Sequence, residues 1–367
     1  NYDPPSGFKA LSTKNLPPDV PSIIRPQKHF DTLLYTGDGS SSNEVTGLEF
    51  KPDLVWIKSR SSTTEHILQD SVRGTYVFTS ISTGVEGDTG GGWVKNRNEH
   101  GFVTDVNGPI NTNSATYVAW CWKAGGAAVT NTEGTITSQV SANTEAGFSI
   151  VSFTGNATSG ATVGHGLNAK PKWFIIKERG NANDWVVYHE SLGSSSGNTN
   201  VQFLNLTNDI GGGFAGGYNN TAPTSSVFSL GNSTETNRSS GNFIAFCWAE
   251  VPGFSKFGKY TGNGSSDGVY VDLGFKPAWL MVKNFTTAYS WDMFDNKRDP
   301  DNVCTQVLAS NLNDAEATTA TCVDFLSNGF KFRNSHNSQN RNGDTFIYMA
   351  FAEQPGTTAF DTFPNAR

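Results

Sequence analysis

The stretch Trp279-Leu280-Met281-Val282-Lys283 determines how this chain is organised, because a stretch of the same kind occurs three times. The earlier copies are Leu54-Val55-Trp56-Ile57-Lys58 and Trp173-Phe174-Ile175-Ile176-Lys177, and a Lys-Pro pair stands shortly before each copy. Short apolar runs bounded by Pro, Gly and Asn are typical of buried strands in β-sandwiches. We therefore expect each run to be a strand in a separate copy of one domain.

The sequence around these runs repeats in the same order. A Tyr/Phe-Thr-Gly motif precedes each run, an aromatic run closes each unit (residues 117–122, 243–248 and 346–351), and an asparagine recurs before that closing run (Asn111, Asn237 and Asn340). The Lys-Pro pairs are too far apart for a solenoid repeat of roughly 20–50 residues. Their spacing suits one β-sandwich of roughly 100 residues per repeat. The sequence thus indicates a triplicated domain.

Composition points to the same fold class. Gly accounts for 39 of the 367 residues and aromatic residues for 12%, whereas only 3 Met are present. Such a chain is poor in strong helix formers and rich in residues that favour strands and turns. We therefore expect an all-β fold of three tandem concanavalin-A-like or jelly-roll β-sandwiches, each closing its own core. The expected divisions are a short, extended, Pro-rich N-terminal leader at 1–29 and repeats at 30–126, 127–253 and 254–367, with 129–140 a candidate first strand of the second repeat.

Charge and hydropathy exclude some classes of partner. The net charge is −7, whereas a protein that binds nucleic-acid backbones presents a basic face. No apolar run reaches the roughly 20 residues of a membrane-spanning helix, so we expect no membrane insertion. Four Cys in 367 residues do not make a disulfide scaffold.

Two sets of motifs resemble known protein families. Residues 4–17, Pro-Pro-Ser-Gly-Phe-Lys-Ala-Leu-Ser-Thr-Lys-Asn-Leu-Pro, look like the closing part of a SPRY-like, concanavalin-A-like sandwich common in bacteriophage proteins. The repeats, with Tyr-Thr-Gly-Asn-Gly, Gly-Phe-Lys-Pro-x-Trp-Leu and Ala-Phe-Ala-Glu-x-Pro-Gly, resemble those of marine phage virion proteins of the tail-fibre-like kind. The resemblance implies a virion surface component with lectin-like sandwiches, and it brings no catalytic residues to this sequence.

Charged residues recur after the lysine that ends each run. Asp70 and Asp295 occupy matching positions, and Arg73 and Arg298 follow three residues later. One interpretation is a ligand site built from Lys, Asp and Arg in each repeat. The other is a cross-strand salt bridge or a charge at a sheet edge. We favour this second interpretation, because the second repeat has Leu192 in place of the arginine.

Aromatic residues divide into two groups. The repeated Trp and Phe positions lie inside apolar runs, where strand alternation favours core packing over sugar stacking. Aromatics in loops, such as Tyr218 and Tyr289, are better candidates for ligand contacts.

The sequence contains little that indicates a metal or cofactor site. The stretch Asp105-Val106-Asn107-Gly108 is rich in oxygen ligands, but no twelve-residue calcium loop with a closing Glu is present, and turn formation explains Asx-Gly pairs. The histidines show no zinc spacing. We therefore expect no metal and no cofactor. Cys304 and Cys322 could lie on neighbouring strands, either paired or reduced.

The leading functional hypothesis is a virion surface protein, either a tail fibre or a capsid decoration. It would bind host-surface glycans or neighbouring virion proteins, as a homo-oligomer with closed symmetry, for which we expect a trimer. One alternative is a structural brick with no ligand. Another is a polysaccharide-degrading enzyme, which is disfavoured because the predicted strands lack the paired acids of sandwich glycosidases.

Overall fold

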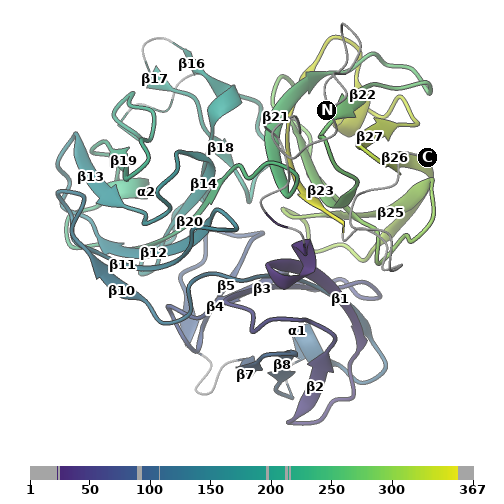
Figure 1. Cartoon of the computed structure of the whole chain (residues 1–367), viewed down its shortest axis with the longest axis horizontal. Helices are drawn as coiled ribbons and strands as arrows, with labels where there is room; N and C mark the ends of the chain where they lie inside the picture. Colours follow the sequence, from purple (N-terminus) through teal and green to yellow (C-terminus); the bar gives the residue numbers. More distant parts are fainter. Residues whose placement is uncertain are drawn as a thin grey trace, which may run out of the picture.

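Three lobes of β-strands surround a common centre in the computed structural model, which describes residues 23, 25–88, 93–106, 108–195, 198–210, 214 and 216–353 (Figure 1). The predicted all-β fold is confirmed: among these residues, the α-helices α1 (Gly108–Asn111), α2 (Thr234–Asn237) and α3 (Asn337–Asn340) are single turns. Most of the expected leader lies outside the described residues, and its end forms the short 3-10 helix η2 (Pro26–Lys28).

The first lobe contains a six-stranded and a three-stranded antiparallel sheet. The larger sheet has the order β1 (Phe30–Thr36), β9 (Thr116–Trp122), β3 (Leu54–Ser59), β4 (Ile67–Asp70), β5 (Tyr76–Thr79) and β6 (Gly87–Asp88). The smaller sheet has the order β2 (Asn43–Thr46), β8 (Gly101–Thr104) and β7 (Val94–Asn98). The closing aromatic run, β9, therefore pairs with both the first strand and the run that ends in lysine.

The second lobe repeats this arrangement and extends it. Its main sheet has the order β10 (Val129–Asn131), β11 (Ser138–Asn143), β12 (Phe148–Thr154), β20 (Asn242–Ala249), β14 (Pro171–Glu178), β15 (Val186–His189) and β18 (Gln202–Phe203). Two-stranded sheets join β13 (Ala161–Gly164) to β19 (Val227–Leu230) and β16 (Ser194–Ser195) to β17 (Asn198–Thr199), and η3 (Glu190–Leu192) follows β15. The stretch expected to begin this repeat supplies β10 and β11.

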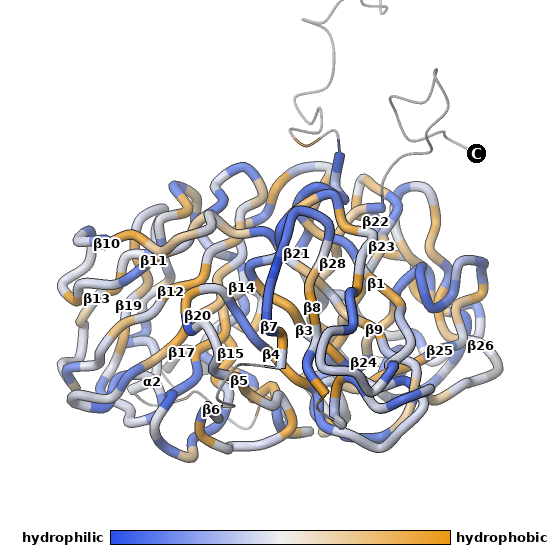
Figure 2. Tube along the Cα trace, turned by 90° about the horizontal axis from the view of Figure 1, so that it is seen from below, coloured by the Kyte–Doolittle hydropathy of each residue, from blue (hydrophilic) through white to orange (hydrophobic). Residues whose placement is uncertain are grey.

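The third lobe is built on one eight-stranded sheet. Its order is β21 (Ser255–Thr261), β28 (Thr345–Ala352), β23 (Pro277–Asn284), β24 (Trp291–Asp295), β25 (Cys304–Ala309), β26 (Ala317–Leu326), β27 (Gly329–Phe332) and β22 (Tyr270–Asp272). The series β1-β9-β3-β4, β12-β20-β14-β15 and β21-β28-β23-β24 is the same in all three lobes. Figure 2 shows the molecule from the side, with α2 and β6 at the end opposite β10 and β22.

The lysine-ended runs are apolar at every position because both of their faces are buried. In β23, Leu280 and Val282 lie in the core of the third lobe, whereas Trp279 and Met281 lie in a second core. β3 and β14 alternate in the same way. Successive side chains of a strand point to opposite faces, so a strand covered on both sides reads as one continuous apolar run.

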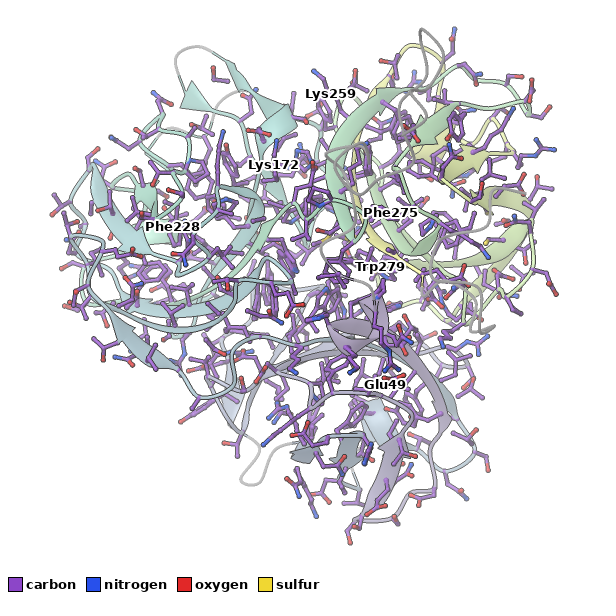
Figure 3. All side chains as sticks on the ribbon, viewed as in Figure 1. Glu49, Lys172, Phe228, Lys259, Phe275 and Trp279 are labelled. Atoms are coloured by element: carbon purple, nitrogen blue, oxygen red, sulfur yellow. The ribbon has the colours of Figure 1, made fainter. Side chains whose placement is uncertain are left out.

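The second core lies between the lobes and is shared by all of them. Trp122 of the first lobe packs against Trp248 of the second, with ring centroids 6.2 Å apart, and against Trp279 of the third at 5.8 Å. In Figure 3, Trp279 lies where the lobes meet, whereas Phe228 and Phe275 lie inside individual lobes. The expectation of three separate cores is therefore incomplete, because a fourth core joins the repeats.

The Tyr/Phe-Thr-Gly motif has a packing cause. A Cβ on Gly37 would lie 2.2 Å from the carbonyl oxygen of Thr112, and one on Gly262 would lie 2.2 Å from the carbonyl oxygen of Arg341. The recurring asparagine holds the same turn: Oδ1 of Asn111 accepts from the backbone N–H of Asp38 at 3.0 Å. Asn237 and Asn340 do the same in the other lobes. These repeated residues are therefore structural.

Candidate binding site

Neighbouring lobes are joined by equivalent backbone hydrogen bonds that follow one direction around the ring. The N–H of Glu86 in the first lobe donates to the carbonyl of Arg179 in the second at 3.0 Å. The second lobe bonds to the third through Ile210 and Phe285 at 2.8 Å. The third lobe bonds back to the first from the N–H of Glu316, also at 2.8 Å. Because the first lobe contacts the second, the second contacts the third and the third contacts the first, the three repeats form a closed ring within one chain.

Ring nitrogens reinforce each joint at equivalent positions. Nε1 of Trp185 donates to the carbonyl of Thr79 at 3.1 Å, and Nε1 of Trp291 donates to that of Phe203 at 3.0 Å. At the remaining joint, Nε2 of His66 lies 3.0 Å from the carbonyl oxygen of Ala309. In each lobe, the aromatic residue at or just before the start of β4, β15 or β24 therefore reaches into a neighbouring lobe.

The charged residues that repeat in the sequence lie within these joints. Nε of Arg73 contacts Oδ2 of Asp70 at 2.6 Å, and Arg298 contacts Asp295 in the same geometry. All four side chains are buried. Arg298 also pairs with Glu316 at 3.1 Å. Each pair joins residues three apart in the sequence, so these are salt bridges within one turn and not across strands. The ligand role of these residues remains a prediction.

The second repeat uses a neutral group at the same position. Nδ1 of His189 accepts from the N–H of Ser191 at 2.9 Å, while Nε2 lies 3.4 Å from the carbonyl oxygen of Tyr348 in the third lobe. Burial lowers the pKa of His189 to about 3. A neutral imidazole therefore serves here both as the turn acceptor and as the contact between lobes.

The lysines that end the runs are buried and bind backbone carbonyls. Nζ of Lys177 donates to the carbonyls of Thr83 and Asn183 at 3.0 and 2.8 Å. Lys283 makes the equivalent pair of contacts, and Lys58 donates to carbonyls in its own lobe. Burial lowers the pKa of Lys177 to about 8. These lysines therefore hold loops in place through backbone carbonyls. The sequence had suggested ligand contacts or cross-strand salt bridges for them.

The two loop tyrosines proposed as ligand contacts, Tyr218 and Tyr289, lie in different lobes. Tyr218 is buried in the core of the second lobe, with its hydroxyl donating to the carbonyl of Val186 at 3.2 Å. Tyr289 is half-buried in the loop after β23. Cys304 and Cys322 lie on the paired strands β25 and β26, and both are free thiols.

The oxygen-rich loops have partners of their own. Asp105 pairs with Lys95 at 3.0 Å, and Asn107 lies outside the described residues. Asp267, in the Asp-Gly pair at 267–268, pairs with Lys331 at 2.6 Å. In the part of the chain that the structure describes, no group of three or more His, Cys, Asp and Glu residues is arranged to hold a metal ion. No helix in that part is long and apolar enough to cross a membrane.

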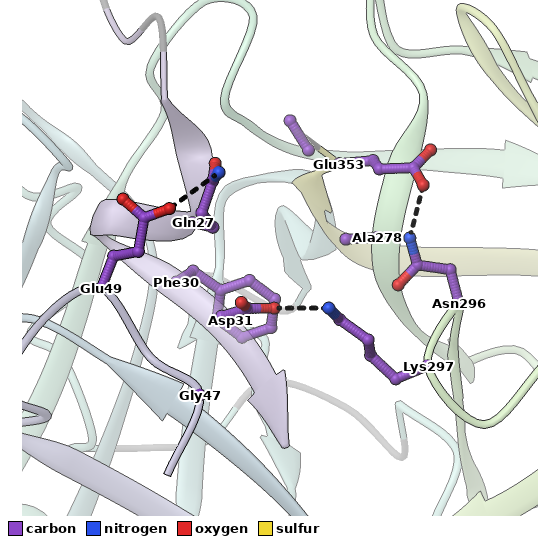
Figure 4. Close-up of a pocket in the computed structure, with 10 residues that line it drawn as sticks. Gln27, Phe30, Asp31, Gly47, Glu49, Ala278, Asn296, Lys297 and Glu353 are labelled. Carbon is purple, nitrogen blue, oxygen red and sulfur yellow. Dashed lines mark hydrogen bonds and ion pairs between the residues drawn. The ribbon is translucent and has the colours of Figure 1, made fainter. Parts of the chain in front are cut away.

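A cavity of about 250 Å³ opens at the joint between the first and third lobes (Figure 4). The first lobe and the η2 segment contribute Gln27, Phe30, Asp31, Gly47 and Glu49. The third lobe contributes Ala278, Asn296, Lys297, Ala352 and Glu353. Residues near both ends of the described part of the chain, Gln27 and Glu353, therefore line the same cavity.

Polar contacts line its walls. Nδ2 of Asn296 donates to Oε1 of Glu353 at 2.9 Å, and Nζ of Lys297 lies 3.6 Å from Oδ1 of Asp31. Burial raises the pKa of Asp31, an effect that the nearby Lys297 opposes. Among the described residues, the buried amide oxygens of Gln27 and Asn296 have no hydrogen-bond partner. In Figure 4 the Asn296 oxygen points toward the space between Asn296 and Asp31.

Sequence reasoning missed this site because its polar residues do not repeat. The position of Asp31 is taken by Ser149 in the second lobe and by Lys256 in the third. The available signal was a departure from the repeat, since Ala278 stands where the other copies have Asp53 and Lys172 between the proline and the run. This difference between the copies can be interpreted only when the three joints between lobes are known to be equivalent.

Comparison with known proteins identifies the family of the chain. A family model described as a domain of unknown function (DUF7483) matches residues 25–355. Neither a curated protein nor a solved structure matches the chain.

Proposed function

This chain belongs to the DUF7483 family of domains, and we propose from its geometry that it is a non-enzymatic attachment protein on the exterior of a virus particle. Its three-lobed head would bind glycans on a host surface. The virion setting rests on the resemblance of its repeats to phage virion proteins. The attachment role rests on the ring.

One observation carries the proposal: equivalent contacts and a shared core fix three copies of one loop set in a single rigid ring. The loops 60–66, 179–185 and 285–290 follow the equivalent strands β3, β14 and β23, so they lie at the same end of the molecule. Rigid display lowers the ordering cost of binding. Three weak contacts to one surface then reinforce each other through effective concentrations in the millimolar range.

The composition of these loops supports contacts with glycans. They contain Ser61-Ser62-Thr63-Thr64, Asn181-Ala182-Asn183 and Thr286-Thr287-Ala288-Tyr289. Hydroxyl and amide groups both donate and accept hydrogen bonds, as sugar hydroxyls require. Arg179, in one of these loops, pairs with Glu86 of the first lobe at 2.8 Å, so its charge is already matched across the joint.

A glycan array probed with the whole chain tests the attachment role. We expect binding to a restricted set of glycans, with retention that falls steeply when the glycan density is lowered. A variant with Thr63, Asn181 and Thr286 all replaced by Ala should lose retention while keeping a cooperative thermal transition, at a temperature lowered by the lost contacts of Asn181 with Glu178 and of Thr286 with the N–H of Thr345. Uniform failure to bind across the array and to host cells would overturn the proposal, as would cleavage of a polysaccharide.

A second candidate is a structural brick that binds neighbouring chains of the particle. It is favoured by two exposed apolar residues on edge strands: Val129 on β10 is 66% exposed, and Tyr270 on β22 is 43% exposed. Edge strands with apolar side chains are natural sites for pairing with another chain. Concentration-dependent association that Val129→Lys abolishes, without glycan binding, would support the brick.

A further inference from the structure

We propose that the third lobe is held in the ring by an acid-sensitive pair of histidines, so that protonation of His66 and His189 releases this lobe from both of its neighbours. His66 lies at the joint between the first and third lobes, and His189 lies at the joint between the second and third. Release of one lobe by acid is a property of the ring itself and does not depend on the attachment role.

The hydrogen bonds of His66 fix which of its ring nitrogens carries the hydrogen. Nε1 of Trp56 lies 2.9 Å from Nδ1 of His66, and an indole N–H can only donate. Nδ1 is therefore the acceptor, and Nε2 donates to the carbonyl of Ala309 in the third lobe at 3.0 Å. A second proton would enter at Nδ1, where it would face the indole N–H. The charged groups that act on this ring, Lys58 and Arg298, are both cations and oppose that proton.

His189 is held by the second lobe in the same way and faces the third. Its Nδ1 accepts from the backbone N–H of Ser191 at 2.9 Å, and a backbone N–H also can only donate. Nε2 therefore carries the hydrogen and lies 3.4 Å from the carbonyl oxygen of Tyr348 in the third lobe. Glu190 favours a second proton on the ring and Lys172 opposes it, but these two groups are paired with each other.

Displacement of the third lobe changes how both histidines take up protons. The exposed fraction is 0% for His66 and 1% for His189, and burial lowers the pKa of the first well below its ordinary value of 6.5 and that of the second to about 3. Ala309 and Tyr348, which face the two rings, move away with the third lobe, so water reaches both. Below an ordinary histidine pKa the released state then binds more protons than the closed ring, and each histidine shifts the equilibrium toward release by about tenfold per pH unit.

The contact between the first and second lobes gains a partner when its histidine is protonated. Nε2 of His29 in the first lobe lies 3.7 Å from Oε1 of Glu145 in the second, so a proton on this half-buried ring completes an ion pair. Burial lowers the pKa of His29, Glu145 raises it, and Lys123 and Lys28 lower it. Acid therefore weakens the two joints of the third lobe more than the contact between the other two lobes.

Hydrogen exchange of the whole chain, read at residue resolution, tests the release because each joint has a backbone N–H that reports on it. The N–H groups of Ile210 and Glu316 span the two joints of the third lobe, whereas that of Glu86 spans the remaining joint. Exchange protection measures the opening that exposes each N–H. Between about pH 7 and 4.5, corrected for the intrinsic exchange rate, protection at Ile210 and Glu316 should fall by at least about 100-fold more than at Glu86. The N–H of Phe332, bonded to Val269 inside the third lobe, should stay protected.

Two variants remove the protonation while keeping hydrogen-bonding groups in place. In His189→Asn, the new side-chain oxygen can accept from the N–H of Ser191 as Oδ1 of Asp70 and of Asp295 do in the equivalent turns. In His66→Gln, the amide supplies both a donor and an acceptor. Because displacement of the third lobe uncovers both histidines, each variant should recover about 100-fold of the lost protection at both joints. Either variant carries the test if the other does not fold.

His165→Asn is the matched control. Its Nδ1 also accepts from a backbone N–H, that of Leu167, but its other partner is the carbonyl of Thr224 in the same lobe. This variant should leave the acid-induced loss at the two joints unchanged. Three results would each overturn the proposal: protection at both joints that survives at pH 4.5, an equal loss at Glu86 and Phe332, or the same loss in both joint variants as in the starting protein.

Discussion

Nε1 of Trp120 in the first lobe donates a hydrogen bond of 3.1 Å to Oδ2 of Asp295 in the third. The same oxygen accepts from Nε of Arg298 at 2.6 Å, and all three side chains are buried. A charged position that repeats along the sequence therefore serves as a fixed acceptor between lobes. Its loss should affect the whole ring.

Replacing Asp295 by Ala should destabilise the protein strongly. Arg298 would stay buried without its nearest carboxylate, and removing one partner of a buried ion pair costs about 3–5 kcal/mol. Urea unfolding followed by tryptophan fluorescence measures this cost. The double variant Asp295→His with Arg298→Leu copies His189 and Leu192 of the second lobe and should cost less, because no unpaired charge remains. An Asp295→Ala protein as stable as the starting one would contradict this view of the joint.

Replacing Trp122 by Ala should lower the stability of all three lobes together. Trp122 packs against residues of both other lobes in the shared core, and Trp-to-Ala changes in cores cost about 3–5 kcal/mol. Calorimetry should show one transition at a lower temperature, as expected for a single cooperative unit. Phe228→Ala, inside the second lobe alone, should likewise shift one transition. Separate melting of the second lobe in that variant would show that the lobes are independent.

The strands were predictable from sequence, whereas the ring was not. The run around Trp279 has apolar residues at every position, which indicates a strand buried on both faces. That pattern does not say what covers each face, so the shared core could not be inferred. Asp70 and Asp295 repeat because the joints repeat. Asn296 and Gln27 could not be identified as cavity residues from the sequence, because the cavity depends on a difference between joints. Residues so distant in sequence also come together only in the folded ring.

Stability should rise with pH between about pH 7 and 8.5. Burial lowers the pKa of Lys283 to about 7 and the pKa of Lys58 to about 8, from an ordinary value near 10.5. Between the folded and unfolded pKa values the unfolded chain binds more protons, so raising the pH favours the folded state. Each lysine contributes at most about 1.4 kcal/mol per pH unit in that window. Urea midpoints measured across this range test the slope.

Variants identify the groups responsible for that slope. Lys283→Met keeps most of the buried chain length while removing the ionisable group, so the pH dependence should become shallower. Lys259→Met changes a lysine on β21 that is exposed to solvent and should leave the slope unchanged. Above about pH 8.5 the trend should weaken, because burial raises the pKa of the Cys304 thiol to about 12 and folding then opposes its ionisation. A midpoint that falls between pH 7 and 8.5 would show that another group dominates.

Replacing Gly37 by Ala should destabilise the first lobe through steric conflict. The new Cβ would lie 2.2 Å from the carbonyl oxygen of Thr112, and the N–H of Gly37 is held by a 2.8 Å hydrogen bond to the carbonyl of Ala115. The backbone therefore cannot relax without losing that bond, and overpacking of this kind costs about 1–3 kcal/mol. Gly180→Ala is the matched control, because a Cβ there meets nothing within 4 Å. Chemical unfolding should show a cost for the first variant and a change within about 0.5 kcal/mol for the second. Equal stability of the two variants would mean that the motif repeats for a reason other than this close backbone approach.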